Sequence, residues 1–360
     1  MSGQQPKAKH GVQIVLITLF MIISLLPVLS MFVTGETQPS ANEILASKPQ
    51  LLDRSGKLNT HVLNDFSDYI ADRFAFRKQL VTAWAKINAA LFHSSAEDQV
   101  VLGTNGWLYY SPTLDDYIGR TMSVEELEHA AAYLASLQQA AEKRGATFIF
   151  TIAPNKNSLY DENMPAYIPE NHCGANAEWL KPYLDEYGVN YVDLFSVFSE
   201  RREVLYYRTD SHWTERGAAL AADSLLNAAG KETTYFDGPF SSGEPHLGDL
   251  YEMLYPSGAE REESESYAPG FAYSLSGDAR GGNAMKIRSS CERREGVLLC
   301  WRDSFGISLY PYLADSFSEA TFLRETSYDP ARIDETGANV VILEIVERNL
   351  SQLADRELID

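Results

Sequence analysis

Three continuous apolar runs constrain the fold of this chain more than any other feature of its sequence. They lie within residues 146–154, 297–302 and 339–346, and a polar turn follows the first two. A strand that is apolar at every position has both faces covered, which is typical of a parallel sheet between two layers of helices. The runs therefore predict buried strands rather than the half-exposed strands of an open antiparallel sheet.

Helical patterns lie between the strands. Ser123-Val124-Glu125-Glu126 is a capping box that begins a helix, and Gly145 ends that helix. Residues 175–187 and 214–229 predict two further helices, with a strand at 189–194 between them. This alternation predicts a three-layer α/β domain with a mostly parallel sheet, in which the chemistry sits beyond the carboxyl ends of the strands.

The remaining segments are less regular. Residues 60–92 repeat apolar side chains at steps of three and four, which predicts helix. Residues 100–110 predict a β-hairpin, because Asn105-Gly106 supplies the positive φ that a tight turn needs. Residues 231–285 are rich in Gly and Ser and are interpreted as a long loop or insertion with some strand content.

The N-terminal part of the chain predicts a membrane anchor. Residues 12–33 are almost purely apolar and exceed the ~20 residues needed to cross a bilayer. Lys7 and Lys9 precede this run, so the positive-inside tendency places residues 1–11 in the cytoplasm as a short tail. A linker at 34–59 and an extracytoplasmic domain at 60–360 follow, which makes a single-pass protein of the cell membrane.

A cleaved signal peptide is the alternative interpretation of this apolar run. Val28-Leu29-Ser30 is a tolerable cleavage site, but the run is longer than a usual signal core, which favours an uncleaved anchor. Both interpretations export residues 35–360, to the periplasm or the cell surface. No second stretch of the sequence is long and apolar enough to span a membrane.

The charge of the chain excludes one class of partner. The formal net charge is −20 and the sequence pI is about 4.8. Nucleic-acid backbones are bound by clustered Lys and Arg, so no nucleic-acid partner is expected. The same charge disfavours an anionic membrane surface as a partner of the exported part.

The chain has three cysteines, Cys173, Cys291 and Cys300. Exported proteins form disulfides, and Cys291 and Cys300 flank a short polar stretch, so they are able to pair across a hairpin and leave Cys173 over. Alternatively, Cys300 is simply a small buried residue of a strand. No C-x-x-C spacing is present, so no structural zinc is expected.

An Asp, a His and a Trp fall within four residues at 210–213, just before a predicted helix. Asp210 and His212 are two residues apart, so in an extended segment they point to the same side. A carboxylate in that position holds an imidazole in one tautomer and stabilises its protonated form. Taken singly, Asp210 is equally a helix cap and His212 an ordinary half-buried histidine.

Such a pair requires a nucleophile, and Ser304 is the best candidate. It follows the apolar strand 297–302 in a polar turn, as Asp303-Ser304-Phe305. The G-x-S-x-G context of an α/β-hydrolase elbow is absent, and the arrangement is instead of the G-D-S type. There the backbone N–H of the serine helps to stabilise a tetrahedral oxyanion. Ser304, His212 and Asp210 are therefore predicted to form a Ser-His-Asp acyl-transfer site.

Together, these motifs resemble a known family. The chain is similar to the SGNH-hydrolase-like domain of the alginate O-acetyltransferase type, which acts in bacterial exopolysaccharide and cell-wall acetylation. As in that family, the Asp and His precede the nucleophile. The matching pieces are Asp68–Arg77, Gly103–Tyr110, Ala153–Lys156, Leu159-Tyr160, Arg208–Thr214, Gly248–Leu250, Arg302–Phe305 and Glu347-Arg348.

The resemblance implies Ser304 as nucleophile, His212 as general base and Asp210 as the residue that orients the histidine. Arg302 stands where ordinary SGNH enzymes have Gly. The usual oxyanion-hole Gly and Asn blocks are not identifiable, so Asn155 and Lys156 are nominated for oxyanion support.

Further residues are nominated with plainer alternatives beside them. Arg348 is nominated for substrate support, with a surface ion pair as the alternative. Trp107, Tyr109 and Trp213 are candidate sugar-binding aromatics, although such residues are often core. His246 and Asp249 suggest a metal, but a polar loop is the preferred interpretation, and neither metal nor cofactor is expected.

The implied function is an anchored O-acetyltransferase. An acetyl-serine intermediate would pass its acetyl group to a hydroxyl of a polysaccharide acceptor, and a membrane-bound O-acyltransferase would supply the acetyl groups as partner. Two alternatives remain at the level of sequence. A carbohydrate acetylesterase would use the same triad with water, and a non-catalytic member of the fold would bind glycan or serve as a scaffold.

Overall fold

A computed structural model describes most of the chain, and its contacts divide the chain into two compact units. Unit 1 comprises residues 1–96 and 252–258, and unit 2 comprises residues 97–251 and 259–360. The described residues are 7–39, 45–53, 55–119, 122–169, 175–277 and 281–359. The domain limits predicted from the sequence, with a boundary at 59/60, stay a prediction.

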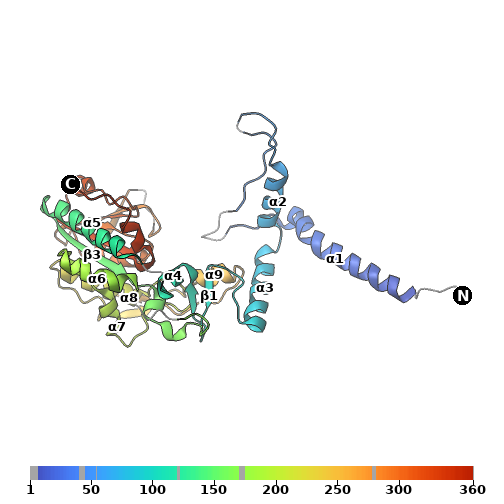
Figure 1. The fold of residues 1–360 in the computed structure, drawn as a ribbon, viewed down its shortest axis with the longest axis horizontal. Coiled ribbons are helices and arrows are strands. Elements are labelled where there is room, and N and C mark those ends of the chain that lie inside the picture. Colours follow the sequence, from blue (N-terminus) through green and yellow to red (C-terminus); the bar gives the residue numbers. More distant parts are fainter. Residues whose placement is uncertain are drawn as a thin grey trace. The chain divides into compact units, whose positions relative to one another are not determined.

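The described residues of the N-terminal part of unit 1 form α1 (Lys7–Thr34), α2 (Val62–Arg73) and α3 (Arg77–Phe92) (Figure 1). Within the described part of the chain, α1 is the one helix that is long and apolar enough to cross a membrane, over Gly11–Met31. The continuous helical pattern of 60–92 is interrupted in the structure. Phe74 is extended and Phe76 is left-handed, with φ of 65°, so the chain turns a corner between α2 and α3.

Unit 2 is built on a seven-stranded sheet of order β4-β3-β11-β9-β10-β8-β7. The pairs from β4 to β10 are parallel, and the last two pairs, β10-β8 and β8-β7, are antiparallel. The mostly parallel sheet predicted from the apolar runs is therefore confirmed. The strands are β3 (Thr147–Ala153), β4 (Tyr191–Val192), β7 (Ser274–Ser276), β8 (Lys286–Ser290), β9 (Val297–Trp301), β10 (Glu319–Leu323) and β11 (Val340–Val346).

Helices cover both faces of this sheet, and two apolar cores result. Successive strand side chains alternate between them, so Ile149 packs in one core while Phe148 and Phe150 pack in the other. The Phe148 face is covered by α5 (Val124–Glu142), α6 (Asn176–Glu186) and α11 (Ala331–Thr336), and α5 and α6 are seen beside β3 in Figure 1. The Ile149 face is covered by α7 (Leu194–Ser199), α8 (Glu215–Ala228) and α10 (Gly306–Ala314).

The local signals of the sequence have the predicted outcome at several points. The hairpin forms from β1 (Val100–Leu102) and β2 (Leu108–Tyr110), with positive φ at Asn105 and Gly106. The capping box of α5 is present, because Glu126 N donates to the Ser123 hydroxyl and Ser123 N donates to the Glu126 carboxylate. The remaining short elements of the described residues are α4 (Leu114–Tyr117), β5 (Phe240–Ser242), β6 (Glu265–Tyr267), α9 (Asp249–Leu254) and 3-10 turns at 111–113, 156–158, 161–163 and 347–353.

The possible disulfide between Cys291 and Cys300 is not formed, and both thiols are free and buried. A hairpin would require β8 and β9 to be neighbours, but each pairs with β10, which lies between them. Cys300 is thus a small buried residue of β9, as in the alternative interpretation. Cys173 lies outside the described residues.

Candidate active site

The structure brings Ser304, His212 and Asp210 together at the carboxyl edge of the sheet. Ser304 follows β9, and the other two residues lie in the loop that precedes α8. The Ser304 hydroxyl is 2.9 Å from His212 Nε2, and His212 Nδ1 is 2.7 Å from Asp210 Oδ1. The three groups thus form one hydrogen-bonded chain, although Ser304 lies 92 positions after the histidine.

The loop that carries Asp210 and His212 is a turn rather than the extended segment expected from the sequence. Tyr206 and Trp213 are paired across it, and His212 N donates to Asp210 Oδ1 over 2.9 Å. The carboxylate therefore fixes both the backbone and the ring of His212. The helix cap is Thr214, which accepts from Gly217 N, so Asp210 does not cap α8.

A second loop completes the environment of Asp210. Asp210 Oδ2 accepts hydrogen bonds from His246 Nε2 at 2.8 Å and from Asp249 N at 3.0 Å. Gly248 allows this approach, because a Cβ at that position would lie 2.2 Å from the Thr209 carbonyl oxygen. The carboxylate thus accepts four hydrogen bonds, of which the sequence pattern indicated only the one from His212.

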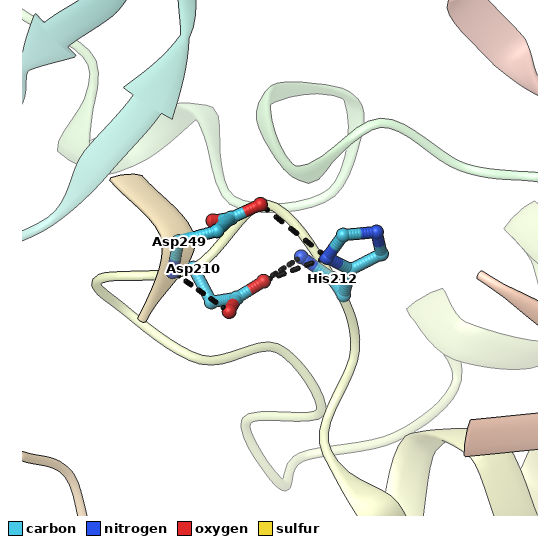
Figure 2. Close-up of side chains that lie close together, drawn as sticks. All are labelled: Asp210, His212 and Asp249. Carbon is cyan, nitrogen blue, oxygen red and sulfur yellow. Dashed lines mark hydrogen bonds and ion pairs between the residues drawn. The ribbon is translucent and has the colours of Figure 1, made fainter. Parts of the chain in front are cut away.

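Asp249 lies beside Asp210, and both carboxylates approach Nδ1 of His212, as Figure 2 shows. Its two oxygens accept from Ser211 N at 2.8 Å and from the Ser211 hydroxyl at 2.6 Å, and Oδ2 is 3.5 Å from His212 Nδ1. His246 stacks on Tyr207 with ring centroids 4.0 Å apart. The sequence placed His246 and Asp249 in a polar loop, and the structure brings that loop against the candidate triad.

The electrostatics of this cluster favour a charged carboxylate beside a basic imidazole. Burial opposes the charge of Asp210, but the hydrogen bonds from His212 and His246 outweigh it and hold the pKa of Asp210 well below its usual range. Burial likewise opposes protonation of His212, yet the bond to Asp210 and the charges of both acids raise the pKa of His212. Burial and the charge of Asp210 raise the pKa of Asp249.

Asp210, His212 and Asp249 also form the one group of potential metal ligands found among the described residues. Their ligand atoms lie within 4.8 Å of one another. However, each carboxylate oxygen of Asp210 and Asp249 already accepts at least one hydrogen bond from a protein donor. This arrangement fits a hydrogen-bonded cluster better than a cation site, whose oxygens would be free to face the metal.

Lys156, nominated for oxyanion support, is buried instead beneath the Asp210 loop. Its ammonium group donates to the carbonyl oxygens of Tyr207, Arg208 and Asp210 at 2.5–3.1 Å. Burial lowers the pKa of Lys156 to about 7, although the charge of Asp210 opposes this. All three donors of the ammonium group are used, so Lys156 fixes the loop and has no N–H left for an oxyanion.

Asn155 follows β3 and is 1% exposed. Its backbone N–H donates to Glu347 Oε2 at 2.8 Å, whereas neither polar atom of its side chain has a partner among the described residues. An amide that is buried without a partner carries a free-energy cost. Asn155 is therefore still a candidate donor at this edge of the sheet.

The two nominated arginines have different surroundings. Arg302 is buried and donates to the carbonyl oxygens of Gly282, Ala284 and Asp303, so it fastens the backbone around the nucleophile loop. Arg348 is half-buried, and its guanidinium carbon is 5.8 Å from the ring centre of Phe305. That ring is 4.8 Å from the His212 ring, and the charge of Arg348 opposes protonation of His212. Arg348 is thus the nominated cation beside the triad.

The three nominated aromatics do not line an open groove. Trp107, Tyr109 and Trp213 are 6%, 0% and 1% exposed. Trp213 packs edge-on against Phe305, 4.9 Å between ring centres, and its indole N–H donates to Ser308. These aromatics therefore support the loops of the site from beneath, and the prediction that they stack on sugar rings does not fit their burial.

A second pair of acids, Asp116 and Glu347, lies at the same edge of the sheet and lines a cavity of about 430 Å³. Glu347 Oε2 accepts from Asn155 N and from the Ser158 hydroxyl. Glu347 Oε1 and Asp116 Oδ2 find no donor in the described part of the chain. Burial and the charge of Asp116 raise the pKa of Glu347 to about 8, so the two carboxyl groups share a proton and pair.

A mostly parallel sheet between two helix layers, with a Ser, a His and an Asp at its carboxyl edge, is the architecture of SGNH hydrolase-like domains. Residues 100–261 match the family model described as the SGNH hydrolase-like domain of acetyltransferase AlgX. Over these residues the chain is similar to the SGNH hydrolase-like domain of AlgX-type acetyltransferases. The matched stretch contains Asp210 and His212 and ends before Ser304.

The curated proteins similar in sequence to this chain include probable alginate O-acetylases. The probable alginate O-acetylase AlgJ of Pseudomonas aeruginosa is 26% identical over 206 residues, which are 55% of this chain and 51% of AlgJ. The AlgJ of Pseudomonas syringae pv. tomato is 25% identical over 233 residues, 59% of this chain and 56% of that protein. The chain thus spans about half the length of the curated relatives it matches.

Solved structures agree on the fold. PatB1 of Bacillus cereus, determined with a sulfonyl adduct, superposes with a TM-score of 0.54 at 19% identity over 70% of this chain and 95% of PatB1. A DHHW family protein from Eubacterium siraeum gives a TM-score of 0.51 at 17% identity over 72% of this chain and 99% of that protein. At these identities the likeness concerns the fold alone.

Proposed function

We propose that this protein is a membrane-anchored, extracytoplasmic O-acetyltransferase that moves acetyl groups to polysaccharide hydroxyls through an acetyl-serine. The observation that carries the proposal is the hydrogen-bonded chain from Asp210 through His212 to Ser304. The AlgX-type domain match and the AlgJ relatives support acetyl transfer as the reaction class.

In the first half-reaction, His212 Nε2 accepts the hydroxyl proton of Ser304 while the serine oxygen attacks the acetyl carbonyl of a donor ester. The tetrahedral intermediate collapses, the donor oxygen leaves with the proton from His212, and acetyl-Ser304 is formed. In the second half, His212 takes the proton of a sugar hydroxyl, whose oxygen attacks the acetyl group. The proton then returns to Ser304 as the acetylated sugar leaves. Asp210 stabilises the imidazolium in both halves.

The oxyanion of each tetrahedral intermediate requires donors besides the backbone N–H of Ser304. Arg348 is the nominated cation that shares the Phe305 contact with His212, and we assign it electrostatic support of the developing charge. Asn155, whose buried side-chain amide at the end of β3 finds no partner among the described residues, is the second proposed donor.

The proposed location follows from α1. An apolar helix that precedes the domain fits a single-pass anchor, with residues 1–11 in the cytoplasm and unit 2 outside the membrane. Acetyl groups would reach Ser304 from a membrane-bound O-acyltransferase, and the acceptor would be a polysaccharide. Both partners are proposed by analogy with the alginate acetylation relatives.

The test uses the full chain in detergent, a chromogenic acetyl ester as donor and uronate or hexose oligosaccharides as acceptors. Ser304→Ala is the critical variant. Ser308→Ala is the matched control, since that hydroxyl bonds to Trp213 rather than to His212. Acetylated oligosaccharide that depends on Ser304 supports transfer, whereas Ser304-dependent hydrolysis without acceptor product indicates an esterase. Equal activity in wild type and Ser304→Ala would overturn the proposal.

A further inference from the structure

Helix α3 of unit 1 carries a row of apolar side chains that no described residue covers. Leu80, Trp84, Ile87 and Leu91 recur at steps of four, three and four residues, which places them on one face of the helix. Their exposed fractions are 51%, 59%, 47% and 68%. An apolar face of this size needs an occupant, because soluble proteins rarely leave such a patch in water.

The opposite face of α3 is already packed within unit 1. Thr82 and Ala85 are buried, and the Thr82 hydroxyl bonds to both the backbone N and the hydroxyl of Ser257. Lys86 lies over the ring of Tyr255. The helix is therefore held by its polar side, and the apolar row faces away from the residues that hold it.

The charge around this row differs sharply from that of the whole chain. Residues 73–96 contain four cationic side chains, Arg73, Arg77, Lys78 and Lys86, and no Asp or Glu, in a chain of net charge −20. The sequence argument against an anionic membrane surface rests on the total charge and does not apply to this segment. Anionic lipid headgroups attract such a local cluster.

Hydrogen bonds tie the start of α3 to the end of α1. Ala75 N donates to the Pro27 carbonyl oxygen at 3.2 Å, and the Thr37 hydroxyl donates to that of Phe74 at 2.8 Å. Arg73 and Tyr69 both contact the Glu36 carboxylate. The corner between α2 and α3 is thus held beside the C-terminal part of α1 (Figure 1), whose apolar span ends at Met31.

From these observations we infer that α3 is an interfacial helix, which lies on the outer leaflet beside the anchor with Leu80, Trp84, Ile87 and Leu91 among the acyl chains. Trp is the side chain that favours this interface, and cations beside it pair with lipid phosphates. The inference rests on the proposed anchoring of α1. Its consequence is that a lipid surface, rather than a flexible tether alone, restrains the chain where it leaves the membrane.

The test measures tryptophan quenching by lipids brominated on the acyl chain, with the full chain in vesicles of phosphatidylcholine and phosphatidylglycerol. Unit 1 offers Trp84 as its one tryptophan, since the other four of the chain are at 107 and beyond. Quenching that is lost in Trp84→Phe and kept in Trp179→Phe is the expected result. The double variant R77Q/K78Q should weaken this quenching in the anionic vesicles and leave it unchanged in pure phosphatidylcholine.

Two other outcomes would overturn the inference and are distinguishable from each other. If the chain floats with the vesicles but Trp84→Phe quenches like wild type, the anchor stands and α3 does not lie on the lipid. Protection of Trp84 from aqueous acrylamide in that case would indicate that protein covers the face. If the chain does not float with vesicles at all, both the anchoring and the interfacial helix are wrong.

Discussion

Two pairs of acids lie at the carboxyl edge of the same sheet, and they have opposite electrostatics. Asp210 and Asp249 both approach Nδ1 of His212, whereas Asp116 and Glu347 face each other beside the end of β11. Asp210 and Glu347 are nearly equally buried, with 5% and 1% of their surface exposed. Yet the pKa of Asp210 is lowered and that of Glu347 is raised to about 8.

The difference lies in the donors rather than in the burial. Asp210 accepts four hydrogen bonds, two of them from histidine rings, and each favours the charged form. Glu347 accepts two bonds from neutral donors on one oxygen, while its other oxygen finds no donor among the described residues. Burial alone therefore does not tell which acid of such a site is charged and able to orient a histidine.

The largest expected effect follows from removing the charge of Asp210. Asp210→Asn keeps the shape of the side chain but cannot stabilise the imidazolium, so acetyl-ester turnover should fall by about 10⁴-fold. The pKa of His212 should fall with it, which would move the acidic limb of the rate profile to lower pH. Turnover rates of both proteins across pH measure this, and full activity in the variant would refute the assigned role.

The next largest effect on turnover is expected from removing the positive charge of Arg348. Arg348→Met keeps an apolar contact with Phe305 but removes the proposed oxyanion support, and turnover should fall by about 10²-fold. Because the charge of Arg348 opposes protonation of His212, the pKa of His212 should rise and the acidic limb should move to higher pH. Arg348→Lys is the control, and its acidic limb should lie at the same pH as that of wild type. An unmoved limb in the Met variant would contradict this placement.

A variant of His246 tests whether the hydrogen bonds that Asp210 accepts from residues other than His212 contribute to turnover. His246→Phe retains a ring over Tyr207 but loses the hydrogen bond to Asp210 Oδ2. Roughly tenfold slower turnover is expected, equivalent to ~1.4 kcal/mol. His246→Gln, which keeps a donor, should recover part of the rate. If both variants match wild type in rate and pH profile, Asp210 needs only its bond to His212.

The smallest effect is expected at the Asp116–Glu347 pair. The pKa of Glu347 is raised from 4.5 to about 8, so its contribution to stability is complete below pH 4.5 and is lost as the pH rises through 8. Glu347→Gln keeps an acceptor for Asn155 and gives Asp116 a permanent donor. Its Tm should therefore fall less than that of wild type between pH 6 and pH 9, and each ~1 kcal/mol of stability that the variant keeps corresponds to roughly 2–4 °C. Parallel pH dependences would show that Glu347 is charged throughout.

Much of the fold could be predicted because its signals are local. The strand at 147–153, the hairpin with Asn105-Gly106 and the capping box at Ser123 depend on residues close in sequence. Ser304 and His212 were predictable as partners because each follows a recognisable strand or precedes a helix at one edge of the sheet. Phe76 has a left-handed backbone and divides the helical pattern of 60–92. It could not be predicted, because that conformation usually falls on glycine and here falls on phenylalanine.

The rest of the site could not be predicted because it depends on contacts between distant loops. His246 and Asp249 come from the irregular segment 231–285, whose path is fixed by the close approach of Gly248 to Thr209. The burial of Trp107 and Lys156 likewise follows from packing beneath the Asp210 loop. A sequence pattern gives the residue types there, but not which of them meet.

The most direct test of the central claim is covalent labelling of the full chain with a fluorophosphonate, followed by intact and peptide mass spectrometry. The account predicts one adduct per chain on Ser304, none in Ser304→Ala, and much slower labelling in His212→Ala and Asp210→Asn. Labelling of wild type on another residue, or equal labelling of Ser304→Ala, would contradict a nucleophile at this position.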